Sequence, residues 1–285
     1  MRVLVTGGAG RLGSEVVKLI ASRGDSAVAF DLPQVSWEAV KGVPGVDMLP
    51  GDVTDGKHVS EATKGVDAVI HLAALLPPRS EFNRELTMKV NVEGTAKIVE
   101  AIGSTGARLV FASSVATYGI TAMEEPPVMT SHPLQVHDCY SESKVKAERL
   151  IGDSGVDHVT LRIAPIAVAD LVELPETIPY RGDQRVELIY VEDAARALLS
   201  AMDESEAIGK TFNIAGGPTW QMTGAEYIQR FYDALGVEVE PRFSDEYTAV
   251  DWYDASQALS LGYQGLTFKG FLEMLMALGE QLGLR

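Results

Sequence analysis

The sequence is poor in cysteine and in long apolar runs. Cys139 is the single cysteine, so no disulfide can form within the chain and an oxidising compartment is not indicated. No stretch approaches the roughly 20 apolar residues that a membrane-spanning helix needs. Met1 and Arg2 lead directly into an apolar run, without the segments of a secretion signal. We therefore expect a cytoplasmic protein with no membrane partner.

Basic residues are scarce as well. The 285 residues include 24 Lys and Arg against 40 Asp and Glu, and the formal charge is -16. Nucleic acids would be repelled over most of such a surface, so we expect a small-molecule substrate and no nucleic-acid partner. An anionic substrate would need local basic groups, for which Arg181 and Arg185 are the candidate substrate-binding residues.

Apolar, β-rich runs alternate with helical patterns over the first two thirds of the chain. The candidate strands are 3–5, 27–30, 46–49, 68–72, 109–112 and 158–162, and helical spacing is present at 12–23, 83–104 and 141–152. This alternation predicts an α/β fold with a doubly wound parallel sheet.

The pattern changes near residue 165, where prolines become frequent. We expect a strand and a helix over 186–202, a helix over 223–235 and an amphipathic helix over 268–282. The core contacts expected on that last helix are Phe271, Leu272, Leu275, Met276 and Leu278. The prediction is a large domain over 1–165, to which parts of 186–215 return, and a small interleaved lobe mainly over 166–285.

A glycine-rich turn, TGGAGRLG, directly follows the first predicted strand and opens a helix. Glycine at Gly7, Gly10 and Gly13 allows a tight turn and close backbone approach, while the helix start offers N–H groups to a pyrophosphate. Arg11 and Leu12 open the helix and belong to the same predicted site. A dinucleotide-binding turn is favoured over a purely structural one in this context.

Asp31 ends the second predicted strand, where a carboxylate can accept hydrogen bonds from ribose hydroxyls and would repel a 2'-phosphate. We therefore expect NAD rather than NADP, although Arg11 is near enough in sequence to the turn to favour a phosphate. Further cofactor contacts are expected after the third and fourth strands. They are Asp52, Val53, Leu72, Ala73 and Ala74.

Tyr140 and Lys144 are four residues apart and therefore share one face of a predicted helix. A phenol titrates near 10, so it needs a nearby ammonium to stabilise its anion if it is to exchange protons at neutral pH. Ser114 ends the fifth predicted strand, where ligands bind in parallel sheets. The alternative is that Tyr140 and Lys144 are ordinary surface residues of a helix without a catalytic role. The presence of Ser114 at the predicted ligand-binding edge of the sheet argues against that alternative.

These segments resemble the short-chain dehydrogenase/reductase family, in its extended NAD-dependent epimerase/dehydratase branch. The resemblance covers nearly the whole chain and depends on TGGAGRLG, GDVTD, HLAA, MKVNVEGT, SSVATYG, YSESK, IYVEDAARA and TFNIAGG, in the family's order. It implies a Rossmann fold with Tyr140 as general acid/base, Lys144 lowering its pKa and binding ribose, and Ser114 orienting the substrate oxygen. It further implies that Asn91 and Tyr140 belong to the cofactor-binding residues, with Asn91 supporting the helix and backbone rather than acting as a catalytic group. A homodimer through the helices holding Asn91 and Tyr140 is implied as well.

Two departures from the family pattern narrow the expected reaction. Val115 and Ala116 stand where the resembling 4,6-dehydratases carry an Asp-Glu pair, so dehydration by that route is not expected. Val186 stands where many nucleotide-sugar enzymes carry a diphosphate-binding arginine, a role that Arg185 or Arg181 would have to fill.

We expect hydride transfer between NAD and a hydroxyl or keto carbon of a sugar, sugar acid or other small polyol. A nucleotide-sugar 4-epimerase with tightly bound NAD and a non-catalytic NAD-binding sensor are the alternatives. No metal is expected, because the histidines lack metal-ligand spacing.

Overall fold

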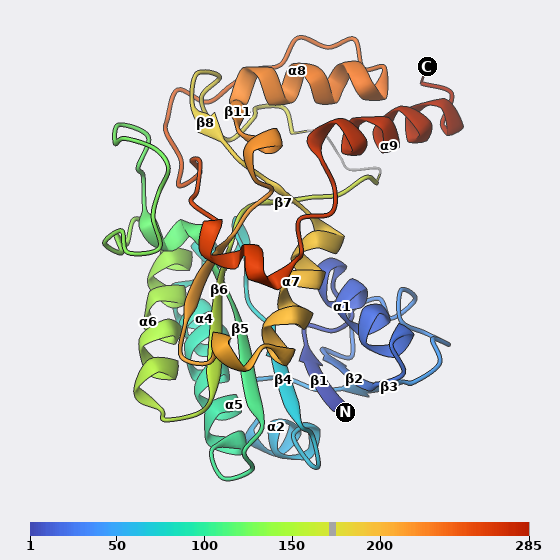
Figure 1. Ribbon diagram of the computed structural model, residues 1–285, viewed down its shortest axis with the longest axis vertical. Helices are drawn as coiled ribbons and strands as arrows, with labels where there is room; N and C mark the ends of the chain where they lie inside the picture. The colour runs from blue at the N-terminus through green and yellow to red at the C-terminus, as the bar shows by residue number, and fades with distance from the viewer. Residues whose placement is uncertain (171–174, 285) are drawn as a thin grey trace.

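Seven parallel strands form the central sheet of the computed structural model, which describes residues 1–170 and 175–284 (Figure 1). Their order in the sheet is β10-β6-β5-β4-β1-β2-β3. The bounds are β1 Arg2–Thr6, β2 Ser26–Asp31, β3 Val46–Pro50, β4 Ala68–His71, β5 Arg108–Ser114, β6 His158–Ile163 and β10 Thr211–Ile214. All six predicted strands are confirmed, and the strand order reverses between β1 and β4, as in a doubly wound Rossmann-type sheet.

Apart from the edge strand β3, which is partly exposed, the sheet is buried on both faces, and this explains why its strands are apolar runs. Val3 and Val5 of β1 face a cluster that includes α1 (Arg11–Ser22) and α7 (Val191–Asp203). Leu4, between them, faces the opposite cluster, built on α2 (Gly56–Ala62), α5 (Gly94–Ile102) and α6 (Cys139–Asp153). Burying each such side chain contributes about 1.5–3 kcal/mol. The alternation fixes the register of β1, because a slip by one residue would exchange the two faces.

The predicted helix 83–104 is present but is not regular. After the short α3 (Arg79–Phe82), α4 (Arg84–Met88) continues through a π-helical turn at Lys89–Glu93 into α5. The wider turn holds Asn91, whose side chain is buried. Such turns often occur at functional sites.

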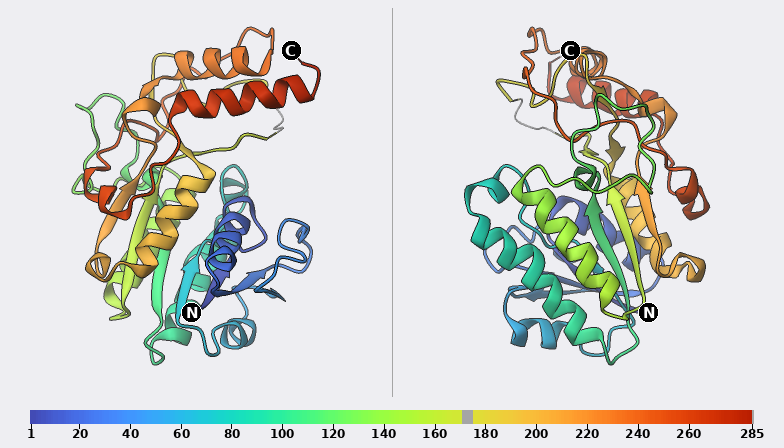
Figure 2. Two further views of the ribbon diagram at one scale, coloured as in Figure 1. Left: turned by 45° about the vertical axis from the view of Figure 1, so that its right-hand side comes forward. Right: turned by 90° about the vertical axis from the view of Figure 1, so that its left-hand side faces the viewer.

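The remaining helices and short strands form a lobe beyond the carboxyl ends of the sheet strands, as Figures 1 and 2 show. Its helices are α8 Gly224–Leu235 and α9 Phe268–Gln281, and its strands are β7 Ile166–Ala167, β8 Arg185–Val186, β9 Ile189–Tyr190 and β11 Met222–Thr223. Single 3-10 turns lie at Val115–Tyr118, Ser205–Ala207, Pro218–Trp220 and Ser256–Leu261.

The lobe has a core of its own, in which the rings of Trp220, Phe268 and Phe271 pack together. Phe271, Leu272 and Leu275 of α9 are buried there, as predicted, and Leu278 packs at the margin. The prediction for Met276 was wrong, since 39% of it is exposed. Met276 lies five positions after Phe271, which turns it away from the helix face that Phe271 and Leu275 share.

The chain crosses between lobe and sheet more than once. β8 pairs with β11 in the lobe, whereas α7 packs on α1 and β10 joins the edge of the central sheet beside β6. Domain bounds of 1–165 and 166–285, with parts of 186–215 returning, stay a prediction. Residues 171–174 of the predicted lobe lie outside the described residues. Within the described ranges, no helix combines the length and apolarity needed to cross a membrane.

Candidate active site

The glycine turn between β1 and α1 is built so that only glycine fits at two of its positions. Gly7 has a φ of 70°, and a Cβ there would lie 3.1 Å from the backbone nitrogen of Ala73. A Cβ on Gly13 would lie 2.0 Å from the Gly7 carbonyl oxygen. Gly10 precedes the first turn of α1, which no side chain caps. The turn is therefore a tight backbone cradle at a helix N-terminus, the arrangement that suits a pyrophosphate.

Other residues around the turn have distinct roles. Arg11 is exposed at the start of α1, whereas Leu12 packs against the cores of both the sheet and the lobe. Gly8, which the sequence analysis missed, is also required, because a Cβ there would lie 2.8 Å from the Ala29 Cα. The Gly7-Gly8 pair in the sequence was the available signal.

Asp31 ends β2 beside the turn. Its carboxylate accepts hydrogen bonds from the Ala9 backbone N–H at 3.1 Å and from the Leu32 N–H at 2.8 Å. Asp52 accepts one from the Thr54 N–H at 2.8 Å, and the Val53 side chain is buried against Gly94 of α5. These contacts fix the loops that follow β2 and β3.

A buried chain of three side chains supports the segment after β4. The Thr6 hydroxyl accepts hydrogen bonds from the backbone N–H groups of Leu72 and Ala73, at 3.1 and 3.2 Å. His71 bridges Thr6 and Thr95, with its two ring nitrogens 2.7 and 2.9 Å from their hydroxyl oxygens. Burial and the nearby Lys144 lower the pKa of His71 to about 3, so its ring is neutral. The sequence places His71 in the fourth predicted strand and in the HLAA motif, but gives no sign of this supporting role.

Asn91 joins that segment to the helix that carries Tyr140. Its side-chain oxygen accepts from the Leu75 N–H at 2.7 Å, and its amide donates to the Leu75 carbonyl at 3.0 Å and to the Ser143 hydroxyl at 2.9 Å. Ala74 lies between Ala73, which is held by Thr6, and Leu75, which is held by Asn91. The geometry is that of a supporting residue, while direct contact of Asn91 with a cofactor stays a prediction.

The N-terminus of α6 is capped twice. Asp138 forms a capping box with Ser141, and Glu81 of α3 accepts hydrogen bonds from the backbone N–H groups of Cys139 and Tyr140 at 2.9 and 3.1 Å. Glu81 is distant in sequence, so no local pattern could have identified it. The two caps fix the position of the first turn, and therefore that of Tyr140.

Tyr140 and Lys144 are buried on the face of α6 that packs on β5. The Lys144 ammonium donates to the Ala112 carbonyl at 2.7 Å and lies 5.8 Å from the Tyr140 ring centroid. Burial lowers the pKa of Lys144 to about 8, against the opposing effect of Glu148. Burial raises the pKa of Tyr140 to about 12, and hydrogen bonding with Ser114 opposes it. At neutral pH the pair is therefore a neutral phenol beside an ammonium.

Ser114 is the last residue of β5, and its hydroxyl oxygen also accepts from the Ala116 N–H at 3.2 Å. The structure thus brings Ser114, Tyr140 and Lys144 together. Their catalytic roles stay predictions.

The two predicted substrate-binding arginines are both paired with carboxylates. Arg185 contacts Asp251, with its second nitrogen 2.9 Å from Oδ2, and Asp251 is only 1% exposed. Arg181 donates two bonds of 2.8 Å to Asp183 and lies over the ring of Tyr247.

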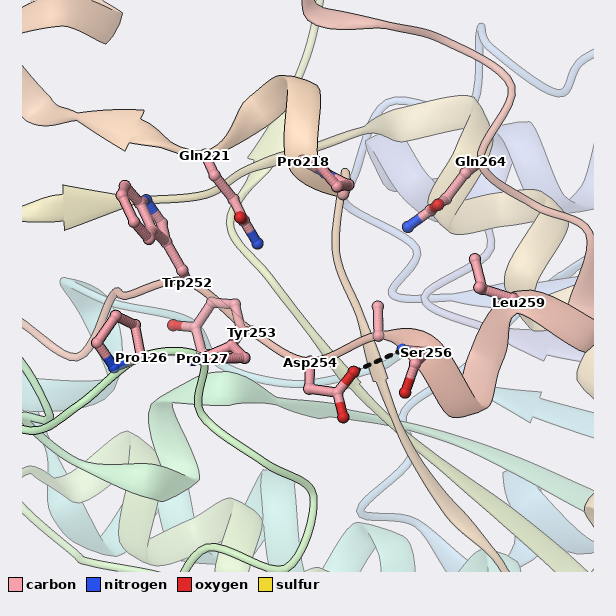
Figure 3. A pocket seen from close by; sticks show the side chains of 12 residues that line it. Pro126, Pro127, Pro218, Gln221, Trp252, Tyr253, Asp254, Ser256, Leu259 and Gln264 are labelled. Carbon is pink, nitrogen blue, oxygen red and sulfur yellow. Dashed lines mark hydrogen bonds between the residues drawn. The ribbon is translucent and has the colours of Figure 1, made fainter.

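A separate cavity of about 410 Å³ lies in the lobe (Figure 3). It is lined by Pro126, Pro127, Gly217, Pro218, Gln221, Trp252, Tyr253, Asp254, Ala255, Ser256, Leu259 and Gln264. The lining includes none of the predicted site residues. Across 1–170 and 175–284, no group of three or more His, Cys, Asp or Glu side chains is arranged to hold a metal ion.

Several proteins of known name resemble the chain in sequence. A 3-beta-hydroxysteroid dehydrogenase from Mycolicibacterium neoaurum is 31% identical over 194 residues, covering 64% of this chain and 49% of the relative. UDP-glucuronic acid decarboxylase 2 from Arabidopsis thaliana is 29% identical over 280 residues, covering 86% of this chain and 60% of the relative. The chain thus spans between 49% and 60% of the length of these two relatives.

Two solved structures share the fold. A UDP-glucose-4-epimerase from Stenotrophomonas maltophila, solved with bound NAD and formylated UDP-arabinopyranose, has a TM-score of 0.86 at 24% identity and covers 99% of each chain. A short-chain dehydrogenase/reductase superfamily protein from Agrobacterium tumefaciens, with bound NAD, has a TM-score of 0.82 at 24% identity and covers 100% of this chain and 98% of that one. Residues 3–167 and 152–215 match a family model, which is described as "NAD dependent epimerase/dehydratase family". The glycine cradle and these matches agree, and the chain belongs to the NAD dependent epimerase/dehydratase family.

Proposed function

We propose that the protein is an NAD-dependent oxidoreductase that acts on a hydroxyl or keto carbon of a sugar, sugar acid or other small polyol. The observation that carries the proposal is the meeting of Ser114, Tyr140 and Lys144 where β5 ends against α6. When bound, NAD supplies the hydride acceptor and its reduced form the donor. Membership of an NAD-dependent family supports this cofactor.

The residues around the glycine turn fit a dinucleotide. Gly7, Gly10 and Gly13 would hold the pyrophosphate against the start of α1, since the space that a Cβ would fill is closed by backbone at Gly7 and Gly13. Asp31 would accept hydrogen bonds from the adenosine ribose and disfavour a 2'-phosphate. Lys144 would donate to the other ribose.

In the proposed reaction, proton transfer depends on the side chains of Tyr140, Ser114 and Lys144. In ketone reduction, the Tyr140 hydroxyl gives its proton to the substrate oxygen as that oxygen gains negative charge, and Ser114 holds the same oxygen by a hydrogen bond. Lys144 stabilises the resulting phenolate through its positive charge. Alcohol oxidation is the reverse and needs Tyr140 to be deprotonated first, which its burial opposes. The protonation states at neutral pH therefore favour reduction.

Binding of an anionic substrate by Arg181 or Arg185 would break an existing ion pair. An anionic group would have to replace Asp183 at Arg181 and the buried Asp251 at Arg185. A buried carboxylate left without its partner is strongly destabilising. This favours the neutral members of the proposed substrate class.

A second candidate function is 4-epimerisation of a nucleotide sugar with tightly bound NAD. It is favoured by the similarity, over 99% of both chains, to a UDP-glucose-4-epimerase. Epimerisation would use the same proton transfer twice, with the keto intermediate turned over between the two transfers, and would consume no cofactor overall.

The test is to mix purified protein with panels of ketones and NADH, and of alcohols and NAD, while following NADH absorbance. Growth or loss of the NADH signal that requires Tyr140 supports the oxidoreductase. Interconversion of UDP-sugars without net NADH change, together with NAD that co-purifies with the protein, would support the epimerase instead. Failure of both reactions across the panels would leave the non-catalytic NAD-binding sensor.

We also propose a cytoplasmic homodimer formed through the helices that carry Asn91 and Tyr140. Phe82 and Leu86, which lie just before and within α4, are 80% and 45% exposed. Burial of such side chains would favour association. Light scattering of purified protein tests the dimer.

A further inference from the structure

The buried face of α6 is fixed to one short stretch of β5 at three levels. Ser114 interacts with Tyr140 and opposes the rise in its pKa, the Ala112 carbonyl accepts from Lys144, and the Ser113 hydroxyl donates to Glu148. Tyr140, Lys144 and Glu148 follow one another at intervals of four residues, so they line one face of the helix. The proposed function uses the first two contacts and leaves the third unexplained.

Glu148 is held from two sides. Besides the bond from Ser113, its Oε1 accepts from the Arg162 Nε at 3.0 Å and its Oε2 accepts from the other guanidinium nitrogen at 2.7 Å. The side chains of Glu148 and Arg162 are only 9% and 8% exposed. A carboxylate that accepts from three donors in such a buried setting is fixed in place.

Arg162 continues the contact across the sheet. Its remaining nitrogen donates to the Tyr118 hydroxyl at 3.0 Å and to the Thr130 carbonyl at 3.1 Å, and the Tyr118 hydroxyl in turn donates to Asn213 of β10. The pair thus joins α6 to three neighbouring strands and to the 3-10 turn that begins directly after Ser114.

Few charges face Lys144. His71 of β4 is neutral, Phe111 of β5 presents its ring 4.8 Å from the ammonium, and Tyr140 is a neutral phenol. Arg162 of β6 is engaged with Glu148. Among the described residues around Lys144, Glu148 is the carboxylate whose charge favours the ammonium.

We propose that Glu148, fixed by Arg162 and Ser113, is a positioning residue that keeps Lys144 protonated and keeps the Tyr140–Lys144 face of α6 seated on β5. It acts through Lys144 and does not touch the substrate. The proposal rests on the proposed function for the role of the ammonium, but its central claim concerns Lys144 itself and is measurable without turnover.

A purely structural ion pair is the competing explanation. Buried ion pairs can often be replaced by apolar side chains of similar volume without loss of stability, whereas removal of one partner leaves an uncompensated charge. The two explanations therefore differ most clearly in a variant that removes both charges and keeps the packing.

The experiment titrates Lys144 by NMR of protein with isotope-labelled lysine, assigned with Lys144→Met, in the wild type, Glu148→Gln and the Glu148→Met/Arg162→Met double variant. Removal of the carboxylate alone in Glu148→Gln should lower the pH at which Lys144 loses its proton by about one unit. The double variant should lower it by less, because loss of the Arg162 charge acts in the opposite direction. Glu148→Gln also leaves the buried charge of Arg162 without a carboxylate partner, so this variant can fail to fold. In that case the double variant is the test. Glu142→Gln, which removes an outer carboxylate from the same helix, should leave the titration unchanged.

The pH profile of kcat supplies the second measurement. Its alkaline limb should move to lower pH by the same amount as the NMR titration, with KM nearly constant. A folded double variant whose Lys144 titrates as in the wild type would overturn the positioning role, whatever the enzyme's substrate. A shifted titration in a protein that transfers no hydride would instead uphold the role of Glu148 and refute the proposed function.

Discussion

Helix α6 and the lobe hold their basic side chains in opposite ways. The Lys144 ammonium donates to a backbone carbonyl, and no carboxylate within 1–170 and 175–284 is bonded to it, whereas Arg185 is bound directly by the buried Asp251. A neutral carbonyl dipole leaves most of the positive charge of Lys144 available to a neighbour. The carboxylate of Asp251 cancels the charge of Arg185.

This difference separates a group whose proposed role is catalytic from one that holds the structure. Arg185 also donates to the Glu124 carbonyl, so it ties the segment around Asp251 to the loop that follows β5. Lys144 contributes little to such cross-linking. Substitutions at the two places should therefore affect different quantities.

The largest expected effect is on the rate of hydride transfer. Tyr140→Phe removes the proton donor and should lower kcat by about 10³-fold while leaving NAD affinity unchanged. Steady-state kinetics with the best ketone from the panel, and calorimetry with NAD, measure the two quantities. Activity within tenfold of the wild type would exclude Tyr140 as the acid.

The next effect is on stability. Arg185→Met leaves Asp251 buried beside an apolar side chain, and we expect the free energy of unfolding to fall by about 3 kcal/mol. Urea denaturation measures the change. The double variant Arg185→Met/Asp251→Asn should recover part of it, and equal stability of the single variant and the wild type would show that the pair is not structural.

The pH dependence of ketone reduction should reflect Lys144. Its pKa is lowered by burial to about 8, so the ammonium is present below that pH and is lost above it. The rate should therefore be flat near neutrality and fall about tenfold per pH unit above about pH 8. A rate that continues to rise to pH 10 would instead indicate that deprotonated Tyr140 limits the reaction.

The smallest effect is expected at Arg181. Its partner Asp183 is solvent-exposed, and exposed pairs contribute little to stability. Arg181→Gln should leave the unfolding midpoint unchanged and should not alter KM for a neutral substrate. An increase in KM confined to anionic substrates would show that Arg181 exchanges partners on binding.

What the sequence predicts correctly here is local or periodic. The six candidate strands are short apolar runs between helical patterns, and the Tyr140–Lys144 spacing places both residues on one helix face without knowledge of the rest of the fold. The glycine turn is local in the positive φ of Gly7 and in the close approach of Gly13 to Gly7, whereas the contacts with Ala29 and Ala73 come from distant segments.

What the sequence left open depends on pairing between distant segments. The cap of Glu81 on α6 and the bond from Ser113 to Glu148 join parts of the chain that no short pattern relates. The Arg185–Asp251 pair is of the same kind, which is why Arg185 was considered for its charge alone. Met276 was placed in the core by its residue type, whereas its position around α9 directs it to solvent.

The Thr6–His71–Thr95 chain makes the support of the glycine turn insensitive to pH. Because the pKa of His71 is about 3, the ring stays uncharged throughout the range in which enzymes are normally assayed. Histidine would ordinarily titrate in that range and carry the turn and the segment after β4 with it. Cofactor affinity should consequently vary little between about pH 5 and pH 8, so that acidity regulates the proton-transfer step without loosening the nucleotide.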